Sequence, residues 1–283
     1  MSPSGEAILA HPIADARQSV SAAQAILYAL SVGYGSQPLD PAHLRHVYEQ
    51  GLEPAPTLAN VVAHHGPWMR TFGVDWPRVV HAEHRLTINR PVPLDTPLIS
   101  RARTLCVVDR GVGKGLFVTF ERVVAVAGTG ERVATIVQTN ACRGDGGGGS
   151  AGAAPDPLEA VPDRGPDAVL DLPIPESAAL LYRLNGDLNP LHIDPDAAAR
   201  VGYPRPILHG LCTFGLAGYA IGHLTEFGRP SRLSFLAARF SAPVYPGEHL
   251  RIEIWISGGD VRFRCMARER GVRVLDHGHA KII

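Results

Sequence analysis

The chain of 283 residues carries the same succession of short sequence patterns twice. The residue numbers of three paired segments differ by 154, 150 and 152: 25–30 and 179–184, 56–58 and 206–208, and 90–92 and 242–244. A nearly constant spacing at three separate places indicates a scaffold that is built twice. The chain is therefore expected to fold into two similar units in tandem.

Each unit is predicted to contain helices followed by antiparallel strands. Apolar residues recur at helical spacing, with Pro and Gly at the ends, over 14–32, 41–50, 57–72, 177–184, 195–201 and 209–224. Alternating apolar residues bounded by turn residues predict strands over 81–89, 98–108, 115–127, 132–141, 231–241, 249–257, 261–268 and 272–281. The segment 209–224 is apolar on nearly every side, so it must be buried. We expect each sheet to wrap around one such helix.

A glycine-rich segment separates the two units. Residues 144–154 have too few large side chains to order themselves, which predicts a flexible linker. The predicted domains are an N-terminal unit at 1–143, the linker at 144–154 and a C-terminal unit at 155–283.

Composition narrows the class of protein. Hydrophobic residues make up 45% and charged residues 19% of the chain, as in folded globular proteins, and the formal net charge is zero. We therefore expect no nucleic-acid partner and no membrane partner. The four cysteines are far apart in sequence and no signal peptide is evident, which predicts a reduced, cytoplasmic protein.

One loop in the second unit concentrates polar side chains. Asp187, Asn189 and His192 lie within six residues, and Pro190 disfavours a helix through them. An Asp and a His that converge on one point can hold and deprotonate a water molecule. The alternative is a purely structural Asx-turn with an incidental His.

The comparison of the two units favours a functional site. At the positions equivalent to the Asp/His loop the first unit has Gly33, Gly35 and Pro38. Where the second unit has His209-Gly210, the first has Ala59-Asn60. A loop needed only for folding should recur with the scaffold, so we assign the chemistry to the second unit.

Two long motifs carry a resemblance to a known family. The segment 182–195 reads Tyr-Arg-Leu-Asn-Gly-Asp-Leu-Asn-Pro-Leu-His-Ile-Asp-Pro, and 206–215 reads Pro-Ile-Leu-His-Gly-Leu-Cys-Thr-Phe-Gly. They resemble the (R)-specific enoyl-CoA hydratases of the MaoC-like, or hydratase 2, type, and in particular the hydratase 2 domain of peroxisomal multifunctional enzymes of type 2. The likeness extends over nearly the whole chain, including Tyr28-Ala29-Leu30, Tyr48-Glu49 and 240–247.

The resemblance implies an α+β double hotdog fold, with two tandem antiparallel sheets that each wrap around a central apolar helix. It also implies reversible hydration of trans-2-enoyl-CoA to (3R)-3-hydroxyacyl-CoA in fatty acid metabolism, a possible homodimer, and neither metal nor redox cofactor. The first unit would then give room for a long or bulky acyl chain.

The family's functional residues fall on definite positions of this chain. Its catalytic pair falls on Asp187 and His192, its active-site Asn on Asn189, and the glycine whose amide meets the thioester oxygen on Gly210. A supporting glutamate falls on Glu49, and substrate contacts fall on His81, Ala82, Arg110 and Phe240. The relatives have Gly in place of Ala82 and usually Lys in place of Arg110.

Other interpretations remain open at this point. A dehydratase acting on carrier-protein, polyketide or steroid side-chain thioesters would use the same fold, and a silent acyl-CoA-binding module would lack turnover. The pairs His64-His65 and His277-x-His279 lack the spacing of a metal site. His209 is equally consistent with bracing the loop.

Overall fold

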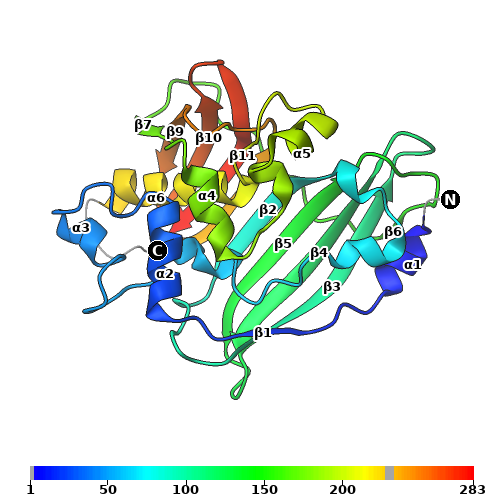
Figure 1. The fold of residues 1–283 in the computed structure, drawn as a ribbon, viewed down its shortest axis with the longest axis horizontal. Coiled ribbons are helices and arrows are strands. Elements are labelled where there is room, and N and C mark those ends of the chain that lie inside the picture. Colours follow the sequence, from blue (N-terminus) through cyan, green and yellow to red (C-terminus); the bar gives the residue numbers. More distant parts are fainter. Residues whose placement is uncertain (1–2, 227–232) are drawn as a thin grey trace.

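The computed structural model describes residues 3–226 and 233–283 (Figure 1). Among these residues, no helix is both long and apolar enough to cross a membrane. Ser231 and Arg232, the first residues of one expected strand, lie outside the described ranges.

The two units share one 11-stranded sheet. Its strand order is β1-β3-β4-β5-β2-β8-β11-β10-β9-β7, with β6 paired to β3. The strands of the first unit are β1 Ala16–Gln18, β2 Val79–Ile88, β3 Leu98–Asp109, β4 Leu116–Val126, β5 Arg132–Cys142 and β6 Ala151–Gly152. Those of the second are β7 Ala168–Pro173, β8 Leu233–Phe240, β9 His249–Ser257, β10 Asp260–Ala267 and β11 Val272–Ile282.

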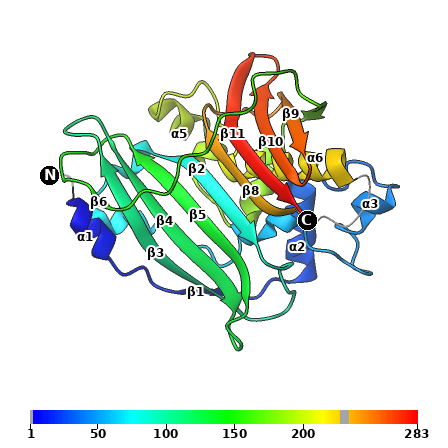
Figure 2. The ribbon, with the colours of Figure 1, turned by 180° about the vertical axis from the view of Figure 1, so that it is seen from behind.

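This strand order is symmetric about its middle. Each unit runs from a short edge strand through three consecutive strands to a central strand, and the central strands β2 and β8 pair antiparallel, with Glu83 opposite Arg239 (Figure 2). The repeat in the sequence is thus a repeat in topology. The sheet and its helices form the double hotdog that the resemblance predicts.

The second unit has the expected central helix. Helix α6, Gly210–Glu226, lies on the inner face of the sheet formed by β8 to β11. Its glycines let other elements approach closely, because a Cβ at Gly215 would lie 2.5 Å from Val32 Cγ1 and one at Gly218 would lie 2.9 Å from Thr57 Cγ2. The helix therefore packs against both units.

Among residues 3–143, which the structure describes, the first unit has no helix equivalent to α6, so the helix predicted over 57–72 is wrong. Only two short 3-10 helices form there, η1 Pro56–Asn60 and η2 Trp68–Phe72. Between them Ala63 has a left-handed φ of 45°, and Pro67 disfavours a helical residue before it. The apolar composition of the segment reflects burial of its individual residues rather than a continuous helix.

The remaining helices are α1 Gly5–Ala10, α2 Ala22–Ser31, α3 Pro41–Leu44, α4 Ala178–Tyr182 and α5 Pro195–Arg200, with 3-10 helices η3 Trp76–Arg78, η4 Arg183–Asn185 and η5 Pro190–His192. Of these, α1 and η3 were not predicted, and α2, α3, α4 and α5 are shorter than the sequence predicts. Helix α2 begins only after Ser21, which forms a capping box with Gln24, and the residues before it form β1.

The glycine-rich segment is held in place, contrary to the expected flexible linker. The amides of Gly147 and Gly149 donate hydrogen bonds to the Asp109 carboxylate, and Gly152 pairs with Cys106 of β3. Backbone donors therefore order a segment that has few side chains to bury.

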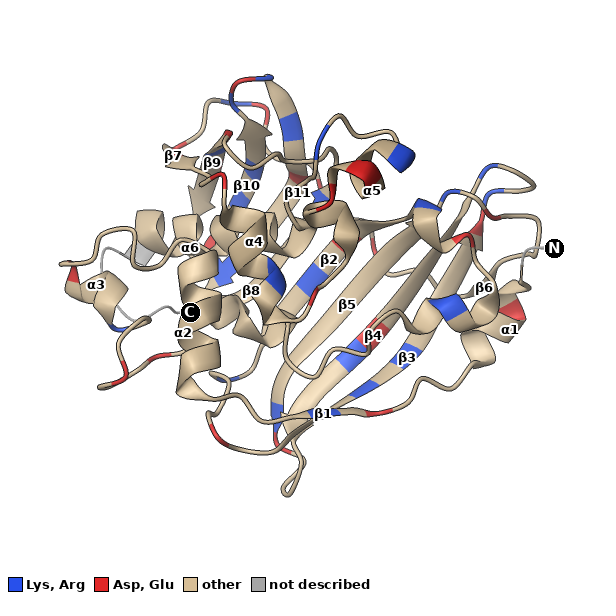
Figure 3. Ribbon diagram, viewed as in Figure 1, with Lys and Arg blue, Asp and Glu red and all other residues tan. Residues whose placement is uncertain are grey.

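One hydrophobic core spans both units. The same cluster of buried residues contains Tyr28 and Leu86 from the first unit and Phe214 and Phe263 from the second. The four cysteines are free and buried. Acidic and basic residues are interspersed along both units (Figure 3).

Candidate active site

The Asp/His loop lies between α4 and α5, beside the first turn of α6 (Figure 1). The backbone N–H of Asn189 donates to Asp187 Oδ1 at 3.2 Å, and Leu191 N–H donates to Asn189 Oδ1 at 3.1 Å. The Asx-turn expected as the structural alternative is present, and it fixes the direction of the Asp187 carboxylate. Asn189 also caps the 3-10 helix η5 that carries His192.

His192 is held in the tautomer that a general base requires. Its Nδ1 lies 2.8 Å from the carbonyl oxygen of Ile207, which only accepts, so Nδ1 carries the proton and Nε2 keeps its lone pair. Burial lowers the pKa of His192, while the Ile207 carbonyl and the Asp187 charge act in the opposite direction. The ring is therefore favoured in the neutral form at neutral pH.

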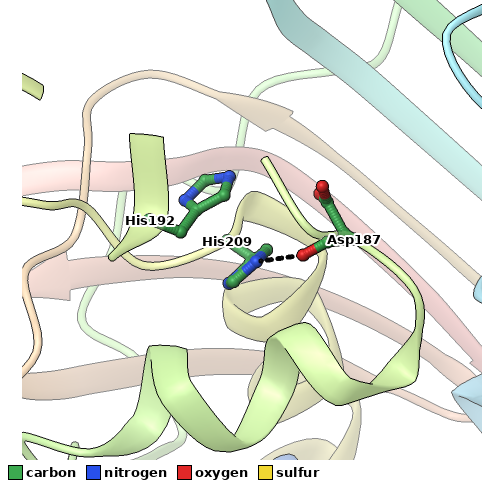
Figure 4. A group of neighbouring side chains, drawn as sticks. All are labelled: Asp187, His192 and His209. Carbon is green, nitrogen blue, oxygen red and sulfur yellow. Dashed lines mark hydrogen bonds between the residues drawn. The ribbon is translucent and has the colours of Figure 1, made fainter. Parts of the chain in front are cut away.

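His209 contacts both members of the pair. Its ring stacks on His192 with centroids 3.7 Å apart, and its Nε2 donates to the backbone carbonyl of Asp187 at 3.2 Å (Figure 4). Burial lowers its pKa to about 4. The ligand atoms of Asp187, His192 and His209 lie within 4.8 Å of one another.

The two imidazole rings of that grouping are stacked rather than directed at one point. An imidazole directs its lone pair in the plane of the ring, and zinc binds at about 2.0–2.1 Å. The rings of His192 and His209 are stacked with only 26° between their planes, so they cannot both point at one ion between them.

Gly210 lies at the first position of α6, next to a residue that touches Asp187. First-turn amides have no acceptor within their own helix, so the Gly210 N–H is available to a ligand. A Cβ at this position would lie 3.1 Å from the ring of Phe240. Glycine therefore keeps open the space between the amide and Phe240.

His81 and Ala82 of β2 lie beside Phe240. The rings of His81 and Phe240 have centroids 4.4 Å apart. The register between β2 and β5 shifts between His81 and Glu83, which places Ala82 in a bulge. The bulge frees the Ala82 backbone from the β5 ladder. Of the predicted substrate contacts, Phe240 thus lies at Gly210 and His81 lies against Phe240.

The first unit contributes His64 and a cavity. The His64 side chain is exposed at the mouth of the cavity, yet desolvation by the protein around its ring lowers its pKa to about 4, with further effects from the charges of Arg122 and Asp187. The cavity occupies the region where the first unit lacks its helix. It is lined by His64, His65, Gly66, Trp68, Met69, Trp76, Phe120, Arg122, Gln138 and Asn140.

Two predicted residues, Glu49 and Arg110, form no bond with this group among the described residues. Glu49 is exposed in the 45–53 loop, which is closed by a hydrogen bond from Glu53 N–H to the Arg45 carbonyl. No hydrogen bond or ion pair among the described residues joins Glu49 to Asp187 or His192. Arg110 is exposed in the turn between β3 and β4, where its guanidinium lies 4.8 Å from the Phe117 ring centroid.

Three further residues near this group, His64, His84 and Arg122, were not predicted as site residues from the sequence. His84 forms two hydrogen bonds. Its Nδ1 lies 3.2 Å from His81 Nε2, and its Nε2 donates to Asn60 Oδ1 at 2.9 Å. Arg122 shares the inward face of β4 with buried Val118, Phe120 and Val124. A charged residue on an alternating apolar face was the available signal for Arg122.

The two half-sheets and their helices define a protein of the hotdog fold with Asp187 and His192 beside the start of α6. Residues 157–277 match the family model described as MaoC like domain, and residues 19–144 match that of the MFE-2 hydratase 2 N-terminal domain. The two matches lie on either side of the glycine-rich segment.

Comparisons over most of the chain agree with these family matches. The chain is 35% identical to the enoyl-CoA hydratase ChsH3 of Mycobacterium tuberculosis over 82% of each protein. It is 32% identical to the peroxisomal enoyl-CoA hydratase 2 of Arabidopsis thaliana, covering 95% of this chain and 92% of that protein. The crystal structure of a MaoC-like dehydratase from Phytophthora capsici superposes with a TM-score of 0.87 at 27% identity, covering 98% of both chains. The chain belongs to the MaoC-like enoyl-CoA hydratase 2 family and is a hydro-lyase.

Proposed function

We propose that this hydro-lyase adds water reversibly to trans-2-enoyl-CoA to give (3R)-3-hydroxyacyl-CoA, and that Asp187 and His192 activate the water. The supporting observation is the hydrogen bond from His192 Nδ1 to the Ile207 carbonyl, which leaves the Nε2 lone pair free beside the Asp187 carboxylate. A base and an anion at one point are what water addition to an enoyl thioester requires.

In the proposed step, His192 Nε2 takes one proton from the water while the oxygen bonds to C3. Asp187 accepts a hydrogen bond from the second hydrogen of the water and stabilises the imidazolium that forms. The double-bond electrons move toward the thioester oxygen, and the imidazolium then returns its proton to C2. The reaction thus adds H and OH across the double bond and leaves the protein unchanged.

The Gly210 amide would hold the thioester oxygen as negative charge develops on it. A preorganised backbone donor of this kind contributes about 3 to 4 kcal/mol to transition-state stabilisation. The Phe240 ring lies close to Gly210, since a Cβ at Gly210 would be 3.1 Å from it. The ring would therefore keep this oxygen away from bulk water. His81 and Ala82 would contact the acyl group on the same side, Asn189 would shape the loop, and Arg110 would meet a phosphate of CoA.

Single substitutions of the pair test the assignment. Asp187→Asn and His192→Gln should each lower kcat for crotonyl-CoA or a longer enoyl-CoA by roughly 10²- to 10⁴-fold, measured as loss of the absorbance of the conjugated thioester. Exposed Asp196→Asn, in the next helix, is the matched control and should keep parental activity. Undiminished hydration by correctly folded Asp187→Asn or His192→Gln would refute the assignment.

A further inference from the structure

The inner faces of the two half-sheets differ in polarity. In the second unit, Phe263, Cys265 and Ala267 of β10 are fully buried and belong to the hydrophobic core with α6. In the first unit, the cavity wall includes Arg122 of β4 and Gln138 of β5. The same scaffold thus places a charged and an amide side chain among apolar ones where it is not filled by a helix.

Arg122 is a buried cation without a protein counter-charge. Its side chain is 2% exposed, and it donates to the backbone carbonyls of Val62 at 2.9 Å, Ala59 at 3.1 Å and Asn60. A guanidinium has five N–H donors, so at least two remain without a partner among the described residues. No carboxylate in the described ranges forms an ion pair with it.

An unpaired buried cation is costly and calls for a ligand. Buried charges in proteins are normally paired or bound to a ligand, because desolvation without compensation is strongly unfavourable. Burial lowers the pKa of Arg122 only to about 10, so the group stays positive at neutral pH. The three hydrogen bonds to backbone carbonyls explain how Arg122 holds the 59–62 segment in place. They do not explain why a positive charge lines the cavity.

The cavity adjoins the reaction site. His64 lines it, and the pKa of His64 responds to burial and then to the charges of both Arg122 and Asp187. On the sheet, His84 lies opposite Gln138 in β5, and Gln138 lies opposite Phe120 in β4. Because His84 contacts His81, and His81 contacts Phe240 beside Gly210, a row of neighbouring residues joins the proposed thioester position to the cavity that Arg122 lines.

We propose that this cavity binds the distal end of the acyl chain and selects substrates that end in a carboxylate, which pairs with Arg122. A guanidinium holds a carboxylate through two parallel hydrogen bonds, the strongest such pairing available to it. The free N–H groups of Gln138 and His64 add donors: Gln138 Nε2 uses one hydrogen toward Asn140 at 2.8 Å, and His64 accepts from Gly66 through Nδ1, which leaves its other nitrogen protonated. A methyl end would instead desolvate Arg122 without a partner. The inference rests on the proposed hydratase function.

Matched substrates test it on the unaltered protein. Trans-2-enoyl-CoA thioesters of several chain lengths are prepared in pairs that end in either a methyl or a carboxyl group, and kcat/KM is measured for each. We expect at least one length at which the carboxyl substrate is preferred by about tenfold or more. Equal rates, or preference for the methyl end at every length, overturn the selectivity. Hydration of neither series would count against the proposed function instead.

Variants test the role of the cation. Arg122→Met should lower the carboxyl-to-methyl ratio of kcat/KM by about tenfold or more, and Arg122→Lys should lower it less, because a point charge remains. Phe120→Leu, which alters the same cavity without changing charge, should leave the ratio at its parental value. If Arg122→Met does not fold, Gln138→Leu, which leaves the 59–62 segment untouched, should still lower the ratio severalfold. An unchanged ratio in the folded variants excludes carboxylate pairing.

Discussion

His209 fixes the relative position of the two proposed catalytic residues. It stacks on the ring of His192 at 3.7 Å and donates to the Asp187 carbonyl at 3.2 Å. Its Nδ1 is buried without a hydrogen-bond partner among the described residues. His209 is therefore a positioning residue, which keeps the water-binding point between Asp187 and His192 constant.

Replacing His209 should affect turnover more than substrate binding. His209→Phe keeps a stacking ring but loses the hydrogen bond to the Asp187 carbonyl. Because the orientation of the pair is lost and substrate binding is not, we expect kcat to fall by roughly tenfold or more with KM little changed. Thermal unfolding should change little, since the substitution also removes an unpaired buried nitrogen. A parental kcat, or a rise in KM alone, would show that the loop holds its geometry without His209.

The predictability of the site differed from residue to residue. Asp187, Asn189 and His192 could be found because the first unit lacks them at equivalent positions. The tautomer of His192 could not be predicted, because it depends on a hydrogen bond to Ile207, which is 15 residues away in sequence. Arg122 was detectable as a charge on the apolar face of its strand, but its significance depends on a missing helix, which the sequence pattern did not predict.

At the scale of elements, the strands were predicted more accurately than the helices. Strand β9, 249–257, begins and ends where alternation predicts. The helix expected over 57–72 fails because Ala63 turns left-handed and Pro67 follows, so apolar composition alone could not distinguish a helix from a buried irregular segment. That irregularity creates the cavity of the first unit.

Strand β2 should make the stability of the protein depend on pH. Burial lowers the pKa of His81 to about 3 and that of His84 well below its usual value, so both are neutral in the folded protein. In the unfolded chain a histidine takes up a proton near pH 6.5. Stability is therefore full above pH 6.5 and is lost as the pH falls below it, by up to about 1.4 kcal/mol per pH unit for each histidine.

Denaturant unfolding at pH 7, 6 and 5 measures this effect. His84→Gln should reduce the loss of unfolding free energy per pH unit by up to about 1.4 kcal/mol, most of it between pH 6 and 5, because one neutral buried imidazole is removed. His223→Gln, at an exposed position on α6, is the control. The same pH slope in the His84 variant and in the parent would contradict the assignment.

At the scale of the whole molecule, the two units form a single structure despite their separate family matches. They share the β2–β8 pairing and one hydrophobic core, and α2 of the first unit packs against α6 so closely that a Cβ at Gly215 would lie 2.5 Å from Val32. The glycine-rich segment is also bonded to β3. A sequence repeat alone suggests two independent domains, and only these contacts show that neither sheet is complete at its inner edge without the other.

The two units should consequently unfold in one transition. The chain offers natural reporters, because Trp68 and Trp76 lie in the first unit and Trp255 in the second. Trp255→Phe leaves fluorescence that reports on the first unit, and Trp68→Phe with Trp76→Phe leaves a reporter in the second. Relative to circular dichroism of the same variant, each fluorescence transition should have the same midpoint, as expected for cooperative unfolding. The contrary outcome is a fluorescence midpoint that differs from the circular dichroism midpoint, in opposite directions for the two reporters. It would mean that the β2–β8 pairing and the shared core are too weak to couple the unfolding of the two units.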